Sequence, residues 1–331
     1  MNTRRDFLKK TGAGAAGLGL AATLPFDLFA EAPAKKLFFD ISLAQFSLAG
    51  SFFSQKLTNI EFPALAKNTY GISNIEYVST FWNGKGGDKA YVKELKTRTD
   101  DLGVRNVLIM VDAEGELGHP DAATRKQAVE NHYKWVEAAK EIGCHAIRVN
   151  LDGPGTDEEI AKAGVDGYGS LVEFGQQAGI SVIIENHFGP STDAKWLVEV
   201  MKQVNNPYAG LLPDFGNFVR RERMEEMTIE AFKNAKVIAT FDKYESVKAM
   251  MPYAKGVSAK THGFDAKGND TETDFVKMLT IIKDSGFKGF MGIEAEGAAM
   301  KMFGVEGNYP TEEEGIKLTK ALLEKVGGKV Y

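Results

Sequence analysis

Charged side chains stand at the ends of four short apolar runs in the second half of the chain. A charged group at the end of a buried strand is costly unless it is paired, hydrogen-bonded or bound to a metal ion. A single strand end of this kind could be explained by a structural ion pair, but four successive strands that end in this way favour a shared site. The residues at these ends are Glu185, Asp214, Lys260 together with His262, and Glu294.

These residue types can bind one divalent cation and move a proton beside it. The three carboxylates and the imidazole of His262 offer oxygen and nitrogen ligands, a set that suits Mn²⁺, Mg²⁺, Co²⁺ or Zn²⁺ without selecting one. A bound cation would polarise a carbonyl group and make the adjacent C–H more acidic. Glu185 or Glu294 could then remove that proton as a general base. Lys260 could stabilise the developing oxyanion, or it could pair with Asp214 or Glu294.

The rest of the chain predicts the elements that would bring these side chains together. Runs rich in β-forming residues alternate with stretches whose apolar residues lie three and four positions apart, which is helical spacing. The eight predicted strands are 37–45, 73–79, 105–111, 145–150, 181–185, 210–214, 256–260 and 289–294. Strands that alternate with helices predict a parallel sheet, and eight such units predict an α/β fold, a single-domain (β/α)₈ TIM barrel over residues 35–331. The C-terminal strand ends of such a barrel share one mouth, where the charged residues would meet.

One segment leaves two interpretations open. The run 237–241 could be a ninth strand. We interpret the whole stretch 232–252 as part of a long connection between the sixth and seventh strands.

The order of the strand-end residues resembles the xylose isomerase-like TIM-barrel superfamily of sugar isomerases and epimerases, across essentially the whole chain after its N-terminal segment. Exported proteins of the sugar phosphate isomerase/epimerase type are the most similar group. The resemblance implies one metal ion bound by Glu185, Asp214 and Glu294.

The chain departs from the family pattern at two positions. The family usually has a metal-binding histidine two residues before a lysine in the seventh strand, where this chain has Ser258. His262 lies two residues beyond Lys260, on the same side of an extended strand, and is the candidate for this ligand. The family also often has a histidine three residues after the aspartate, where this chain has Asn217.

The resemblance and the chemistry together predict a metal-dependent isomerase or epimerase that acts on an unphosphorylated sugar or sugar derivative. Bases on two faces of the substrate would allow epimerisation. If the enediolate carries a leaving group at the next carbon, the same residues would catalyse elimination, so a keto-glycoside lyase or hydrolase is an alternative. A metallo-endonuclease of the same superfamily and a non-catalytic sugar-binding barrel are the other classes considered.

Several further polar residues are candidates for substrate binding. They lie in the loop after the third strand, in the fourth strand and just after the fifth. They are His119, Arg148, Asn150 and His187. Glu76, inside the second strand, is expected to form a structural salt bridge.

Composition limits the partners. The 331 residues carry a formal net charge of −5, which argues against a nucleic-acid binder, and 44% of them are hydrophobic, which argues against disorder. The single cysteine, Cys144, excludes an internal disulfide and a cysteine-rich metal site. We expect a small carbohydrate as partner and no nucleic acid, and the chain could form a homo-oligomer.

The N-terminal segment has the features of an export signal. Arg4 and Arg5 precede Phe7 and Leu8, and a run rich in glycine, alanine and leucine follows. This order is typical of a twin-arginine signal, which a receptor recognises and which is not an anchor. We predict a signal over residues 1–34, a periplasmic protein, and no stable membrane insertion once the signal is removed.

Overall fold

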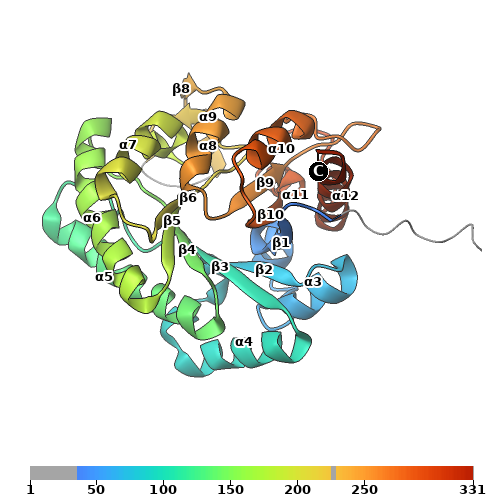
Figure 1. Cartoon of the computed structure of the whole chain (residues 1–331), viewed down its shortest axis with the longest axis horizontal. Helices are drawn as coiled ribbons and strands as arrows, with labels where there is room; N and C mark the ends of the chain where they lie inside the picture. The colour runs from blue at the N-terminus through green and yellow to red at the C-terminus, as the bar shows by residue number, and fades with distance from the viewer. Residues whose placement is uncertain (1–35, 225–228, 331) are drawn as a thin grey trace, which may run out of the picture. The chain divides into compact units, whose positions relative to one another are not determined.

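The computed structural model describes residues 36–224 and 229–330, in which eight parallel strands form one curved sheet (Figure 1). In spatial order the strands are β6, β5, β4, β3, β2, β1, β10 and β9. Their bounds are β1 (Asp40–Ala44), β2 (Asn74–Val78), β3 (Arg105–Val111), β4 (Ala146–Val149), β5 (Ser181–Glu185), β6 (Ala209–Leu212), β9 (Val257–Thr261) and β10 (Phe290–Ala295). Every neighbouring pair in the sheet is parallel.

The two edges of this sheet meet and close a barrel. Isolated parallel bridges join Leu211 to Ala254 and Asp214 to Ser258. The backbone N–H of Ser258 donates to the carbonyl of Pro213 at 2.9 Å. β9 therefore lies beside β6 and its continuation, and the predicted (β/α)₈ TIM barrel is confirmed.

Helices on the outside of the sheet form the connections between the strands (Figure 1). The α-helices are α2 (Ala49–Phe53), α3 (Phe62–Tyr70), α4 (Lys89–Leu102), α5 (Ala122–Ile142), α6 (Asp157–Ala178), α7 (Ala194–Val204), α8 (Ile229–Asn234), α9 (Lys243–Met250), α10 (Phe275–Asp284), α11 (Gly297–Met302) and α12 (Glu312–Val330). Short 3₁₀ turns are η2 (Gln45–Leu48), η3 (Ser79–Trp82), η4 (Lys85–Gly87), η5 (Gly189–Thr192) and η6 (Met251–Tyr253).

Capping residues at both ends of α5 determine where the helix begins and where the chain turns into β4. The side chain of Asp121 accepts a hydrogen bond from the N–H of Thr124 and caps the helix start. Gly143, with φ of 84°, adopts the left-handed conformation that ends the helix and lets the chain enter β4.

The connection between β6 and β9 contains a small separate sheet. β7 (Val219–Arg221) and β8 (Val237–Thr240) pair antiparallel, outside the eight-stranded sheet. The run 237–241 therefore contains a strand, and that strand lies within the long connection, not in the barrel wall. We call β7 and β8 together the β7–β8 hairpin.

The barrel wall is buried on both faces, and the successive β3 residues Leu108, Ile109 and Met110 are at most 1% exposed. Strands buried on both faces are nearly continuous in apolar residues, as expected in a parallel sheet. The predicted export signal lies outside the described residues. None of the helices among the described residues is both long enough and apolar enough to cross a membrane.

Candidate functional site

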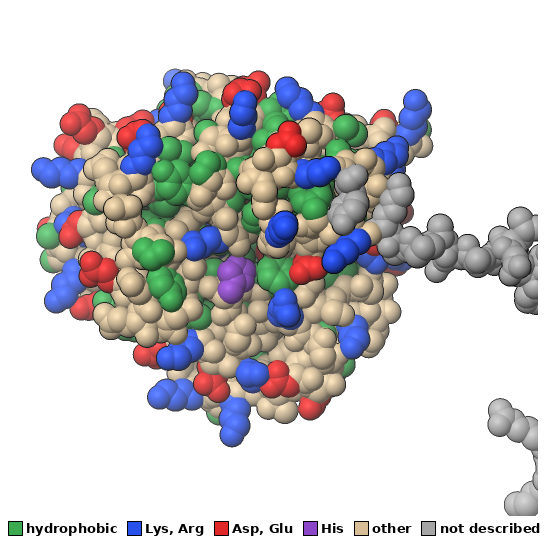
Figure 2. All heavy atoms as spheres, viewed as in Figure 1, with side chains coloured by type: hydrophobic (Ala, Val, Ile, Leu, Met, Phe, Trp, Pro, Cys, Tyr) green, Lys and Arg blue, Asp and Glu red, His purple; other side chains and the backbone are tan. Residues whose placement is uncertain are grey.

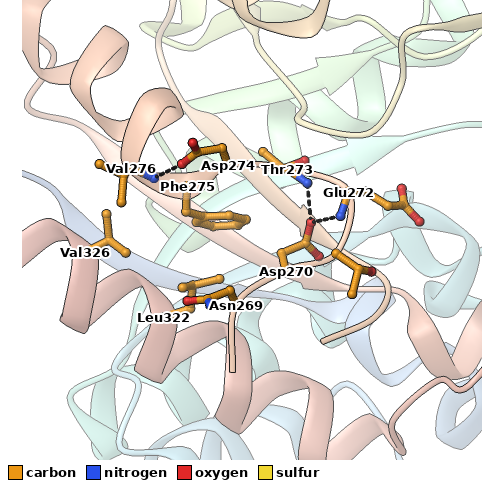
Figure 3. Close-up of a pocket in the computed structure, with 10 residues that line it drawn as sticks. Asn269, Asp270, Glu272, Thr273, Asp274, Phe275, Val276, Leu322 and Val326 are labelled. Atoms are coloured by element: carbon orange, nitrogen blue, oxygen red, sulfur yellow. Dashed lines mark hydrogen bonds between the residues drawn. The ribbon is translucent and has the colours of Figure 1, made fainter. Parts of the chain in front are cut away.

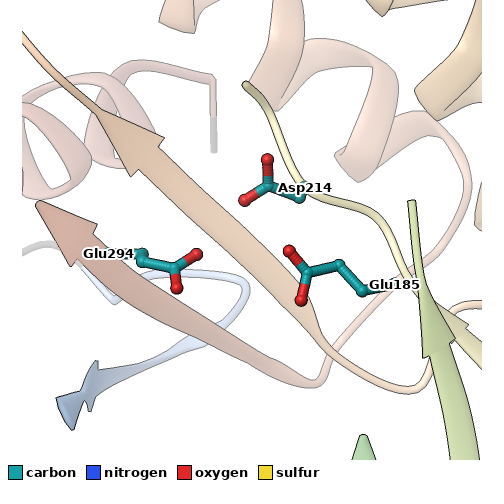
Figure 4. Close-up of side chains that lie close together, drawn as sticks. All are labelled: Glu185, Asp214 and Glu294. Atoms are coloured by element: carbon teal, nitrogen blue, oxygen red, sulfur yellow. The ribbon is translucent and has the colours of Figure 1, made fainter. Parts of the chain in front are cut away.

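Three buried carboxylates converge at the C-terminal ends of the barrel strands. Glu185 ends β5, Asp214 follows β6, and Glu294 lies near the end of β10. They are 1%, 0% and 4% exposed, and one oxygen from each lies within 4.8 Å of the others. Figure 4 shows the three side chains pointing into the same space. We call Glu185, Asp214 and Glu294 the acidic triad.

The surroundings of the triad disfavour three separate negative charges. Burial raises the pKa of Glu185 well above its ordinary value despite the nearby Arg148, and the other two acids add to the rise. Burial also raises the pKa of Glu294 to about 7, against the opposing effect of Lys260. The triad therefore has a surplus of negative charge that a divalent cation would neutralise.

Ser258, in β9, bridges two members of the triad. Its hydroxyl lies 2.6 Å from Oδ2 of Asp214 and 2.7 Å from Oε2 of Glu294. One hydroxyl can donate only one hydrogen bond, so both contacts are satisfied only if one carboxyl group carries a proton. Oδ1 of Asp214 accepts from the backbone N–H groups of Gly216 and Asn217 at 2.8 and 3.0 Å. These contacts fix the direction of the Asp214 carboxylate.

Lys260 lies among the carboxylates as their counter-charge. It is 5% exposed, and its Nζ is 3.7 Å from Asp214, 3.6 Å from Glu294 and 3.3 Å from Glu296. Burial lowers its pKa, but the carboxylates outweigh burial and hold the pKa well above its ordinary value. Of the two roles considered for Lys260, the pairing with Asp214 and Glu294 is therefore present, and it leaves the ammonium close to any oxygen that binds at the triad.

Arg148 and Asn150, candidates for substrate binding, hold other side chains in place. Arg148 is 4% exposed, and its guanidinium contacts Asp112 at 2.5 Å and Glu185 at 2.8 Å. Asn150 receives a bond from Arg148 at 3.3 Å and contacts Nδ1 of His187 at 3.0 Å. The guanidinium is thus the counter-charge of Glu185, whose other oxygen, Oε1, accepts a hydrogen bond from the amide of Asn217 at 2.9 Å.

Glu76, in β2, pairs with a hydroxyl group, which corrects the expectation of a salt bridge. The hydroxyl of Ser42 donates to Oε1 of Glu76 at 2.5 Å, and among the described residues Glu76 has no ion pair within 4 Å. Burial raises its pKa to about 7, although the Ser42 bond opposes the rise. The side chain fits against β10 because Gly292 has no Cβ, which would lie 2.6 Å from Oε2 of Glu76.

His262 is not brought into the triad. Its Nδ1 lies 3.0 Å from Glu272 and its Nε2 lies 3.5 Å from Glu296. Burial lowers its pKa, but these two carboxylates raise it to about 9. A protonated imidazole cannot bind a metal ion through nitrogen. The side chain of β9 that touches the triad from the position of the family histidine is that of Ser258.

His187 and His119 have different surroundings. His187 follows β5 and lines the pocket described below. Burial lowers its pKa to about 3, with Arg148 and Lys260 contributing, so its ring is neutral near pH 7. His119 lies in the loop between β3 and α5, where its ring accepts a bond from the N–H of Asp121 at 3.1 Å, and it is not among the residues that line this pocket.

A pocket of about 370 Å³ opens beside the triad. Its polar lining includes His187, Asn217, His262 and Glu296, and its other side is formed by the β7–β8 hairpin. On the face shown in Figure 2, basic and acidic side chains are interspersed. The pocket is large enough for a small organic molecule.

A second cavity, of about 450 Å³, lies between the segment 269–276 and α12 (Figure 3). It includes Glu272, which contacts His262, but no member of the acidic triad. No triad member lines the smaller pocket either, but its lining includes Asn217, whose amide donates to Oε1 of Glu185 at 2.9 Å, and Glu296, which pairs with Lys260. We therefore assign the site to the smaller pocket.

Four residues of the site are not among the candidates identified from the sequence. They are Asp112, Asn217, Ser258 and Glu296, of which Asn217 and Ser258 were noted only as departures from the family pattern. Asp112 directly follows β3, and Glu296 directly follows β10. The strand-end rule that identified the triad would have identified these two acids as well.

A model of the xylose isomerase-like TIM barrel family matches residues 65–324. No match was found among curated protein sequences.

Solved structures share the fold at low sequence identity. The D-psicose 3-epimerase from Clostridium cellulolyticum H10, solved with D-tagatose, is 12% identical and covers 87% of this chain and 99% of its own, with a TM-score of 0.64. The IOLI protein, solved with a zinc atom, is 16% identical over 88% of this chain and 99% of its own, with a TM-score of 0.60. A xylose isomerase-like TIM barrel protein from Mycobacterium smegmatis, in complex with magnesium, is 12% identical over 88% of this chain and 97% of its own, with a TM-score of 0.58.

The neighbours thus include a sugar epimerase and proteins of the same fold that bind zinc or magnesium, and the buried triad of this chain could bind a metal ion. The family match extends over most of the eight-stranded barrel that carries the triad. The chain belongs to the xylose isomerase-like TIM barrel family.

Proposed function

We propose that the protein is a metal-dependent sugar isomerase or epimerase that removes a proton next to the carbonyl group of an unphosphorylated sugar or sugar derivative. The convergence of Glu185, Asp214 and Glu294 in one buried group carries this proposal. A sugar epimerase among the solved neighbours supports it. A divalent cation bound by the triad would polarise the carbonyl and make the adjacent C–H more acidic.

The positions of the two glutamates suit proton transfer at a bound sugar. β5 and β10 are separated by β6 and β9 around the barrel, so Glu185 and Glu294 approach the site from different sides. A proton removed by one carboxylate could be returned by the other on the opposite face, which is epimerisation. Lys260, 3.6 Å from Glu294, would stabilise negative charge that develops on the substrate oxygen.

The donor atoms suggest which metal ion binds. The triad and Ser258 offer oxygen atoms, whereas the imidazole of His262 is engaged by Glu272 and Glu296. Mg²⁺ and Mn²⁺ favour oxygen ligands, whereas structural and catalytic zinc sites usually include nitrogen or sulfur. We therefore propose Mn²⁺ or Mg²⁺, with Co²⁺ and Zn²⁺ as the less suitable ions.

The cations around the pocket favour a substrate without a phosphate group. Arg220 is paired with Asp157 through two contacts of 2.6 and 2.5 Å. Arg223 is paired with Glu116 and Asp152. Lys260 is surrounded by carboxylates. A phosphate dianion would have to displace these acids, so a neutral sugar is the better fit.

Elimination from a keto-glycoside is the second candidate, and one observation favours it. The pocket extends from Asn217, which donates to Glu185, to the β7–β8 hairpin, which leaves room for a leaving group next to the reacting ring. Removal of the same proton, followed by loss of that group, would give an unsaturated product. The residues required are the same.

We also propose that the protein acts in the periplasm, which rests on the arginine pair and apolar run at the N-terminus. Cell fractionation with a C-terminal tag tests this. Substitution of Arg4 and Arg5 by lysine should retain the protein in the cytoplasm, and unchanged export would refute the twin-arginine route.

The activity is tested by hydrogen exchange. The protein is loaded with Mn²⁺ and incubated in D₂O with a panel of ketoses and keto-glycosides, and proton NMR follows the products. An isomerase or epimerase introduces deuterium at one carbon, and a lyase produces an unsaturated sugar. A sugar-binding protein without activity gives neither result, which would refute the proposal.

Glu294→Gln should abolish this exchange and leave the fold intact, because the amide cannot accept the proton. Glu313→Gln, an exposed glutamate in α12 that pairs with Lys317, is the matched control and should exchange at the wild-type rate. Equal rates in the two variants would remove Glu294 from the chemistry.

A further inference from the structure

The pocket has two chemically different parts. Next to the triad it is polar, with His187, Asn217, His262 and Glu296 in its lining. The rest of the lining combines the apolar side chains of Phe188, Val219, Ile238 and Met300 with five charged residues: Asp152, Arg220, Arg221, Glu222 and Arg223. A sugar ring with its hydroxyl groups matches the first part. In the second part the three arginines already bind groups of the protein, which leaves the apolar side chains as the surface for a ligand.

The hairpin concentrates exposed apolar side chains at this place. Among the described residues, six large hydrophobic side chains are clearly exposed, and three of them belong to the β7–β8 hairpin: Val219 at 45%, Val237 at 52% and Ile238 at 57%. Val219 and Ile238 line the pocket, whereas Val237 does not. Exposed β-branched side chains that line a pocket are available to an apolar ligand.

The hairpin is held in position by ion pairs that also set its charge. The Arg220 guanidinium is bidentate with Asp157, and Arg223 donates to the carbonyl of Gly153 at 2.7 Å. The N–H of Glu222 donates to the carbonyl of Lys236 at 2.8 Å and continues the pairing beyond β7. Arg221, the third arginine of the lining, donates to the carbonyl of Ala235 at 2.8 Å. The apolar surface is therefore preformed, and all three arginines are engaged by groups of the protein, so the occupant that fits is uncharged.

We propose that the outer part of the pocket is a subsite for an apolar aglycone, so that the substrate is a glycoside whose sugar ring lies at the triad and whose apolar substituent lies against Val219 and Ile238. The subsite rests on the proposed function, because that function places the sugar ring at the triad. Continuity carries the inference, since one pocket contains both the polar residues beside the triad and the apolar side of the hairpin.

A binding experiment tests the subsite without turnover. Methyl and phenyl glycosides of glucose, galactose and xylose are titrated into the protein, and their dissociation constants are measured by calorimetry or by saturation-transfer NMR. The two glycosides of each sugar differ only in the apolar group. We expect at least one phenyl glycoside to bind about 10-fold more tightly than its methyl counterpart, the range that a few apolar contacts in a pocket provide.

The double variant Val219→Ser/Ile238→Ser should abolish that ratio. Val237→Ser, a matched substitution of an equally exposed residue on the same hairpin, should preserve it. Thermal unfolding of the three proteins checks that the barrel is unchanged. Equal affinity for the phenyl and methyl glycosides in the wild type, or a ratio that survives in the double variant, overturns the subsite.

The exchange assay separates failure of the subsite from failure of the proposed function. A phenyl preference that depends on Val219 and Ile238, without deuterium exchange or elimination on any sugar tested, supports the subsite and refutes the enzyme activity. Exchange on free sugars, without any preference for the phenyl glycoside, refutes the subsite and leaves the activity in place.

Discussion

Replacing Arg148 by methionine removes the buried guanidinium that lies between Asp112 and Glu185. The wild-type contacts are 2.5 and 2.8 Å, and Arg148 and Glu185 are 4% and 1% exposed at their side chains. Methionine has a similar length, so the change removes the charge and the hydrogen bonds and leaves most of the volume. Glu185 would then be a buried carboxylate without its counter-charge, although the amide of Asn217 would still donate to it.

The cost follows from that burial. Breaking a buried ion pair by removing one partner destabilises a protein by about 3–5 kcal/mol, because the remaining charge is uncompensated. The Asp112 side chain is 29% exposed, so water compensates it in part. We therefore expect Arg148→Met to lower the free energy of unfolding by about 3 kcal/mol, the lower end of that range.

Urea unfolding at pH 7, without added divalent metal, measures this loss. Arg125→Met is the matched control, because Arg125 pairs with Asp166, whose side chain is 65% exposed. Arg125 also donates to the carbonyls of His119 and Pro120, but its loss leaves an exposed carboxylate, so the control should lose only about 1–2 kcal/mol. Arg148→Lys keeps the positive charge and should lose less than Arg148→Met. Losses of equal size in Arg148→Met and Arg125→Met would refute the conclusion that Arg148 holds Glu185.

Three further predictions follow from the site. Ser258→Ala should weaken Mn²⁺ binding about 10- to 100-fold in calorimetry, because the hydroxyl orients Asp214 and Glu294. Ser285→Ala, at the end of α10, is the control and should bind Mn²⁺ like the wild type. An unchanged Mn²⁺ affinity in Ser258→Ala would contradict the role of Ser258. Excess Mn²⁺ should raise the melting temperature of the wild type, since a ligand at 100 times its dissociation constant adds about 2.7 kcal/mol of stability; Asp214→Asn should abolish the increase, and an equal increase in that variant would place the ion elsewhere. The pKa of His262 is raised to about 9, above its value of about 6.5 in an unfolded chain. The stability that its ion pairs contribute is therefore complete below pH 6.5 and is lost as the pH rises to 9. Unfolding measured from pH 6 to 9.5 should show this loss in the wild type but not in His262→Gln, and identical profiles for the two proteins would refute the prediction.

Most of the barrel could be predicted from the sequence because its signals are local. β3 and β5 have the bounds that the apolar runs predicted, and the other six barrel strands differ from the prediction by a few residues at their ends. Strand ends are set by hydrogen bonds to neighbouring strands, which periodicity does not contain. β8 lies within the run 237–241, which the sequence offers as a possible strand, whereas β7 has only three residues and no alternating pattern to mark it.

The acidic triad could be predicted because parallel strands place their C-terminal ends at one mouth. The partners of each acid could not be predicted, since they depend on distances across the barrel. Arg148 was expected to face substrate, but it pairs with Glu185, and Glu76 pairs with Ser42 because its side chain packs against Gly292 of β10. His262 is engaged by Glu272, a residue of the following loop that has no motif to mark it.

Anomalous diffraction from crystals grown with Mn²⁺ tests the central claim most directly. We predict one strong anomalous peak within coordination distance of carboxylate oxygens from Glu185, Asp214 and Glu294, with Nζ of Lys260 outside the coordination sphere. A peak bound by other residues, or no peak at the triad in crystals that bind Mn²⁺ elsewhere, would contradict the assignment of these three acids as the metal site.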